Sequence, residues 1–186
     1  DLPRRITTPS LMGETGLDYH YDHSDRVLQQ ALFRTHIAVA RLTGLPVVIH
    51  TRDAEDDTLA ILREELGQGV FPALIHCFTG TAAFGRAVLD MGLSISISGI
   101  VTFKNAGALQ AFVREIPLGR LLIETDSPFL APVPHRGKVC EPAFVRDTAR
   151  FIAELRGEAL EVLADATTDN FKSLFGKAVF SSRNAP

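Results

Sequence analysis

Short apolar runs alternate with amphipathic segments along most of the chain. The apolar runs are only a few residues long, are rich in valine, isoleucine and leucine, and therefore predict buried strands. The predicted strands cover residues 10–13, 46–50, 71–76, 93–98 and 120–124. The intervening segments predict helices at about 25–43, 54–66, 82–91 and 106–115, followed by two more at about 142–156 and 159–175.

The predicted helix over 25–43 has the clearest helical periodicity. Its apolar residues recur at intervals close to one helical turn, which predicts one face packed against a core. These residues are Leu28, Leu32, Phe33, Ile37 and Ala40. Ser24 and Asp25 can cap the start of the helix, and Gly44 followed two residues later by Pro46 stops it.

Strands that alternate with helices predict a parallel α/β architecture. Five β/α units are visible in the 186 residues, whereas a closed (β/α) barrel of the TIM type needs eight units and about 250 residues. The pattern therefore leaves two possibilities, an open α/β sheet or a barrel that lacks about three units. No linker or low-complexity stretch divides residues 1–186, so we expect a single domain.

The composition is that of an ordinary globular protein, with 46% hydrophobic and 22% charged residues. The longest apolar runs are too short to span a membrane, and no secretory signal is recognisable. The two cysteines, Cys77 and Cys140, are far apart and form no CxxC pair, which favours a reducing, cytoplasmic location. The formal net charge of −3 excludes a broadly basic nucleic-acid surface, so local cations, above all metal ions, would have to hold any phosphate.

Acidic and imidazole side chains follow the ends of four predicted strands. Glu14 follows the first strand, His50 and His76 end the second and third, and Asp126 follows the fifth. Because the carboxyl ends of parallel strands form the active face of a β/α fold, we expect the four side chains to converge. Each residue alone is as consistent with a structural hydrogen bond or a helix N-terminus as with a site.

Two imidazoles and two carboxylates are suitable ligands for Zn²⁺ or Mn²⁺, or for Mg²⁺ if more oxygen ligands join them. Such an ion makes water a nucleophile near neutral pH, and a second ion could stabilise the leaving oxygen. Asp126 is the residue that we expect to accept the proton of that water.

Several cationic and aromatic residues near these positions are candidates for substrate contacts. Arg52, and His135 and Arg136 in the proline-stiffened loop 132–138, could bind phosphate, although surface loops often carry such charges without a function. The aromatic run Tyr19, His20 and Tyr21 could stack on exposed bases or could cover the barrel rim. The glycine-rich stretch at 13–16 lacks the Lys-Ser/Thr ending of a phosphate loop.

Several multi-residue motifs, in the same order along the chain, resemble the TatD family of metal-dependent deoxyribonucleases. The matching stretches are GETGLDY at 13–19, VIHTRD at 48–53, IHCFTG at 75–80, SGIVTF at 98–103, ETDSPFLAP at 124–132, VPHRGK at 133–138, EP at 141–142 and TTDNF at 167–171. The resemblance implies a TIM barrel with one or two divalent ions (Mg²⁺, Mn²⁺ or Zn²⁺). It also implies hydrolysis of DNA phosphodiester bonds, often as a 3′→5′ exonuclease acting on single strands or 3′ ends.

Carried over to this sequence, the resemblance implies a role for each matching residue. Glu14 would bridge two metal ions, and His50 and His76 would bind one of them. Asp126 would bind the other ion and orient the attacking water. For Arg52, His135 and Arg136 the resemblance implies phosphate contacts.

The chain departs from the family pattern in one respect. The family begins with a strand that ends in a His-x-His pair, and the 186 residues contain no such pair. About three β/α units that precede the Glu14 strand in the family are also absent, as in a fragment or a rearranged product. We therefore expect weakened or altered metal binding by this chain, and an open sheet whose exposed edges could pair with another molecule.

Two other functions are compatible with the same residues. A barrel with these ligands could hydrolyse amides or other phosphoesters, because only the family motifs favour DNA. Alternatively, a truncated chain could bind a partner or nucleic acid without turnover.

Overall fold

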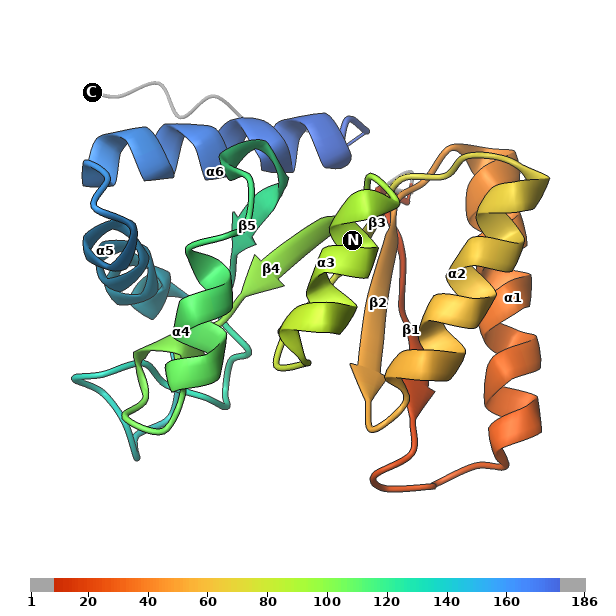
Figure 1. Cartoon of the computed structure of the whole chain (residues 1–186), viewed down its shortest axis with the longest axis horizontal. Helices are drawn as coiled ribbons and strands as arrows, with labels where there is room; N and C mark the ends of the chain where they lie inside the picture. The colour runs from red at the N-terminus through yellow and green to blue at the C-terminus, as the bar shows by residue number, and fades with distance from the viewer. Residues whose placement is uncertain (1–8, 178–186) are drawn as a thin grey trace, which may run out of the picture.

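The computed structural model describes residues 9–177. Residues 1–8 and 178–186, which the predicted single domain includes, lie outside the described residues. Five strands form one parallel sheet in chain order (Figure 1). They are β1 (Met12–Asp18), β2 (Val47–Arg52), β3 (Ala73–Ile75), β4 (Ser94–Ile97) and β5 (Leu121–Ile123).

Helices connect successive strands and cover the sheet. The α-helices are α1 (Arg26–Thr43), α2 (Glu55–Gln68), α3 (Ala82–Asp90), α4 (Gly107–Val113), α5 (Val145–Arg156) and α6 (Leu160–Leu174). Short 3₁₀ helices lie at Gly99–Thr102, Leu118–Arg120 and Pro142–Phe144. Helix α1 packs on β1 and α2 on β2, while α5 and α6 both contact β5 (Figure 1).

The order of the strands distinguishes the two architectures that the sequence left open. Each strand pairs with the next one along the chain, so the sheet has no point at which the strand order reverses. A doubly wound sheet has such a reversal, whereas a (β/α) barrel does not. The sheet is open over the described residues and has the topology of part of a TIM-type barrel, which confirms the predicted fold class.

Alternate residues of each strand face opposite sides of the sheet, as the strand period of two requires. Ile49, Ile75, Ile95 and Ile97 face the helices and belong to the main hydrophobic core. Leu74 and Leu122 instead pack with Phe175, which follows α6, in a separate small cluster on the opposite face. This second face is the one that lines the inside of a barrel.

The first predicted strand was placed too early in the sequence. The prediction ended it at residue 13, but β1 extends to Asp18, so Glu14 lies inside the strand and not after it. The glycines caused the error, because Gly13 and Gly16 in the sequence favour a turn over a continued strand. In the structure they allow β1 to approach β2: a Cβ on Gly16 would lie 1.9 Å from the carbonyl oxygen of His50.

Helix α1 has the predicted ends but not all of the predicted buried face. The Asp25 side chain accepts hydrogen bonds from the backbone N–H groups of Val27 and Leu28, and Gly44 adopts the left-handed conformation that ends the helix. Leu28 and Leu32 are 51% and 48% exposed, so their predicted burial was wrong for the described residues. Leu32 lines a hollow beside β1, which is an edge strand of the sheet over the described residues.

Within residues 9–177, no helix combines the length and the apolar character that crossing a bilayer requires.

Candidate metal centre

Four strands direct polar side chains to the inner face of the sheet: Glu14 from within β1, and His50, His76 and Glu124 near the carboxyl ends of β2, β3 and β5. Within β2, His50 has the same orientation as Val48, two residues earlier. The same spacing relates His76 to Leu74 of β3 and Glu124 to Leu122 of β5. Parallel pairing brings Gly16 opposite His50, which places Glu14 of β1 beside the histidines.

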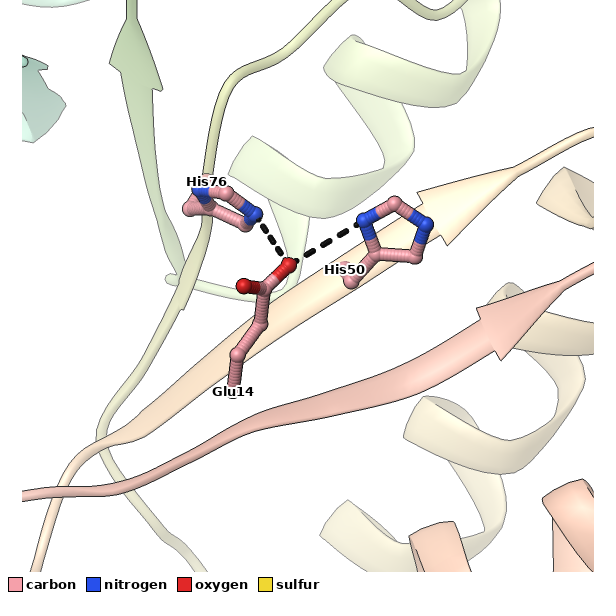
Figure 2. Close-up of side chains that lie close together, drawn as sticks. All are labelled: Glu14, His50 and His76. Carbon is pink, nitrogen blue, oxygen red and sulfur yellow. Dashed lines mark hydrogen bonds and ion pairs between the residues drawn. The ribbon is translucent and has the colours of Figure 1, made fainter. Parts of the chain in front are cut away.

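Glu14 lies between the two imidazoles (Figure 2). Its Oε1 atom is 2.5 Å from Nε2 of His76 and 3.2 Å from Nδ1 of His50. The three side chains come from three adjacent strands, and their ligand atoms lie within 4.8 Å of one another. A single small cation could therefore contact all three.

A second group of possible ligands shares His76 with the first. Nδ1 of His76 is 3.4 Å from Oε1 of Glu124, and the ligand atoms of His76, Glu124 and Asp126 lie within 4.8 Å of one another. The other oxygen of Glu124 accepts a short hydrogen bond from the Ser96 hydroxyl of β4. His76 thus has a carboxylate at each ring nitrogen, and its side chain is only 14% exposed.

The electrostatics follow from this alternation of carboxylates and imidazoles. Hydrogen bonds from His50 and His76 hold the pKa of Glu14 well below its ordinary value. Burial lowers the pKa of His76, but hydrogen bonds with Glu124 and Glu14 outweigh it and raise the pKa to about 10. The hydrogen bond with Glu14 also raises the pKa of His50. Burial raises the pKa of Asp126.

The donor set is suitable for a divalent cation. Glu14, Glu124 and Asp126 bring three carboxylates to one small volume, and no Lys or Arg within residues 9–177 forms an ion pair with them. Even when both imidazoles are protonated, the three carboxylates leave an excess of negative charge in one cleft, so they repel one another and would also repel a phosphate. One or two divalent ions would remove both penalties, and imidazole with carboxylate oxygen is a normal ligand set for Zn²⁺ and Mn²⁺.

Asp18, at the end of β1, supports this cluster from the side. Its Oδ2 atom is 2.9 Å from Nε2 of His50, so the ring of His50 lies between Asp18 and Glu14. A carboxylate on the outer nitrogen of a histidine fixes the ring orientation and makes the other nitrogen a better ligand. Asp18 therefore orients His50 toward Glu14.

A cavity of about 450 Å³ opens over the cluster. Glu14, His50, His76 and Asp126 all line it, so the structure brings together the four residues that the sequence indicated. Arg52, at the end of β2, lines the same cavity. It is the one predicted phosphate-binding residue that lies at this cavity within the described chain.

His135 and Arg136 lie elsewhere and have other partners. The ring of His135 stacks on Phe144 with 3.8 Å between the ring centroids, and its Nε2 atom is 3.1 Å from Oδ2 of Asp147. The guanidinium of Arg136 lies 3.9 Å above the centroid of the Phe103 ring. Neither residue lines the cavity over the cluster.

Sequence reasoning missed Glu124 and Asp18. Glu124 directly follows β5 and shares the orientation of Leu122, so alternation along the strand could have identified it. Asp18 could have been identified only if β1 had been extended through the glycines to its true end.

The fold and the site together define a class of protein. A parallel sheet in sequential strand order, with histidines and carboxylates at the carboxyl ends of its strands, is the arrangement of the metal-dependent (β/α)-barrel hydrolases. Residues 5–176 match the family described as TatD related DNase. The chain belongs to this family.

Named relatives of the chain agree with this assignment. The chain is 54% identical over 164 residues to the metal-dependent hydrolase YcfH of Escherichia coli K12, a match that covers 88% of the chain and 62% of that protein. It is 38% identical over 170 residues to a protein of Pantoea ananatis named 3′-5′ ssDNA/RNA exonuclease TatD, covering 89% of the chain and 65% of the relative. The chain thus spans less than two thirds of the length of these relatives.

A solved structure supports the fold. The crystal structure of YJJV, a TatD homologue from Escherichia coli K12, superposes with a TM-score of 0.81 at 27% identity. The match covers 89% of this chain and 63% of that one.

Proposed function

We propose that this chain carries the catalytic centre of a divalent-metal-dependent nuclease that hydrolyses DNA phosphodiester bonds, in the manner of a 3′→5′ exonuclease on single strands. One observation supports this most directly: the Glu14 carboxylate lies between His50 and His76 in a cavity that Asp126 and Arg52 also line. The family match and the name of the Pantoea relative favour nucleic acid as the substrate.

Two ligand groups would hold the metal. Glu14, His50 and His76 form the first group, and His76, Glu124 and Asp126 form the second. A divalent ion supplies Lewis acidity toward a phosphoryl oxygen and lowers the pKa of water toward neutrality. Mg²⁺, Mn²⁺ and Zn²⁺ are the candidates.

The residues of the chain would supply the remaining chemistry. Asp126 has no side-chain hydrogen-bond partner within residues 9–177, and burial raises its pKa. It is therefore the residue that we assign to accept the proton of the attacking water. Asp18 would keep His50 oriented. Arg52 would bind a phosphate of the strand, since its guanidinium offers several donors at the cavity wall.

A hydrolysis assay tests the proposal. The protein is incubated with a 3′-labelled single-stranded oligonucleotide and Mg²⁺ or Mn²⁺, and in parallel with an amide substrate. We expect metal-dependent loss of the 3′ label, its abolition by EDTA, and no amide hydrolysis. Cleavage that persists in Glu14→Gln, or hydrolysis of the amide alone, would contradict the assignment.

A further inference from the structure

The loop that follows β1 carries an exposed group of aromatic rings beside the metal centre. Tyr21 is 56% exposed. Its ring is parallel to that of His23, with an interplanar angle of 3° and 5.5 Å between the centroids. Tyr19, in contrast, is turned away: its hydroxyl donates to Asp57 at 2.7 Å. Tyr21 instead lines a hollow beside the cluster, which Glu14 and His50 also line.

The Arg52 side chain contacts the Tyr21 ring. Its guanidinium carbon lies 4.9 Å from the centroid of the Tyr21 ring, and its Nη1 atom donates to the Tyr21 hydroxyl at 3.3 Å. Several other arginines of the described chain pair with carboxylates, such as Arg34 with Glu64 and Arg86 with Glu115. Arg52 forms no such ion pair in residues 9–177, so an aromatic ring orients its charge without neutralising it.

The position of Tyr21 is fixed through the same carboxylate that orients His50. Oδ1 of Asp18 accepts the backbone N–H of Tyr21 at 2.9 Å, while Oδ2 is 2.9 Å from His50. Buried Gln29 of α1 binds both the N–H and the carbonyl of Asp18, at 2.8 and 3.1 Å. These hydrogen bonds fix the end of β1 against α1, and they tie the placement of Tyr21 to that of a candidate metal ligand.

We propose that Tyr21 is a positioning residue that holds the Arg52 guanidinium toward a phosphate of a nucleic-acid strand, next to the phosphate that lies over the metal cluster. The inference rests on the proposed nuclease function for the identity of the strand. The tyrosine ring occupies one face of the guanidinium and leaves its remaining N–H donors for a phosphate in a two-pronged contact. No carboxylate within residues 9–177 forms an ion pair with Arg52, so its charge is available to a phosphate in a protein whose formal net charge is −3.

The salt dependence of binding gives a readout that a merely structural role would not change. Each phosphate contact to a single strand contributes about 0.7 to the slope of log K against log salt. Binding of a short single-stranded oligonucleotide with nuclease-resistant phosphorothioate linkages is measured by fluorescence anisotropy over a range of NaCl concentrations. Arg52→Gln should reduce the magnitude of this negative slope by about 0.7 and should weaken binding.

Tyr21→Leu should lower the slope in the same direction, and Tyr21→Phe, which keeps the ring, should lower it less. The double variant Tyr21→Leu with Arg52→Gln should bind no more weakly than Arg52→Gln alone, because the tyrosine acts through the arginine. Arg34→Gln is the matched control, since Arg34 is already paired with Glu64 away from the cavity. It should leave the slope unchanged.

An unchanged slope in Tyr21→Leu, with a reduced one in Arg52→Gln, would overturn the positioning role. An unchanged slope in both variants, or no binding by the wild type, would overturn the phosphate contact itself. The proposed function fails differently: a wild type that binds with an Arg52-dependent slope but never cleaves unmodified DNA with metal would refute catalysis and leave the inference standing.

Discussion

The two candidate ligand groups of the metal centre are built differently. Glu14, His50 and His76 come from three neighbouring strands, and two imidazoles share one carboxylate. The second group has one imidazole and two carboxylates, and Asp126 lies in the loop after β5. Strand pairing thus determines the first group, whereas a loop completes the second. The ligand chemistry also differs, because more nitrogen favours Zn²⁺ and more oxygen favours Mg²⁺ or Mn²⁺.

The two groups meet at His76, so its loss should have the largest effect. In His76→Asn both groups lose their imidazole, and we expect metal affinity to fall more than about 100-fold, beyond the range for residues that only support a ligand. Calorimetric titration with Mn²⁺ measures this. The control is His135→Asn, which removes a histidine that lies outside the cavity. Equal affinities in the two variants would contradict the shared role of His76.

Glu14→Gln should separate the groups. It removes the carboxylate between the histidines but leaves His76, Glu124 and Asp126 in place. We expect the metal affinity of the first group to fall by about 10- to 100-fold or more, while the second group keeps its affinity. Glu64→Gln is the matched control, because Glu64 is exposed and pairs with Arg34. If Glu14→Gln removed all binding, the two groups would have to be regarded as one site.

The first group depends on how closely β1 approaches β2, so Gly16→Ala should damage it through the backbone. The added Cβ would lie 1.9 Å from the carbonyl oxygen of His50, and the φ angle of Gly16 is +141°. We expect the free energy of unfolding, measured by urea denaturation, to fall by at least about 1–3 kcal/mol. Gly137→Ala is the control, since Gly137 also has a positive φ but no neighbour within 4 Å of the added atom. A smaller loss in Gly16→Ala than in this control would argue against the close approach.

The smallest expected effect is the release of a proton from His76 when a metal ion binds. His76 has a pKa of about 10 against an ordinary value of 6.5. In the metal-free protein its proton stabilises the fold fully below pH 6.5, and this contribution is lost as the pH rises from there to about 10. At pH 8 a metal ion must displace that proton, so we expect release of about one proton per ion and tighter binding at higher pH. Titrations in HEPES and Tris, which differ in ionisation enthalpy, measure the number released; none released would contradict the role of His76.

Much of the fold could be predicted from the sequence, because alternation of apolar runs with helical periodicity is a local signal. It located five strands close to their observed positions and predicted the parallel order. The end of β1 was missed, since the conformational freedom of Gly13 and Gly16 reads as a turn until the neighbouring strand is known. The exposure of Leu28 and Leu32 was missed for a related reason: periodicity identifies an apolar face but not whether another element covers it.

The sequence indicated the convergence of Glu14, His50, His76 and Asp126, because strand ends meet at one face of a parallel sheet. It did not indicate which residues lie between them. Glu124 was passed over although it directly follows β5, and Asp18 was hidden by the misplaced end of β1. The stacking of Arg52 on Tyr21 joins the end of β2 to the loop after β1 and could be seen only in three dimensions.

The most direct test of the metal centre is a crystal of this chain soaked in Mn²⁺ and examined by anomalous diffraction. The account predicts an anomalous peak within coordination distance of Glu14, His50 and His76, with any second ion beside Glu124 and Asp126. Peaks confined to other parts of the surface, with the Glu14 carboxylate still hydrogen-bonded to both imidazoles, would contradict it.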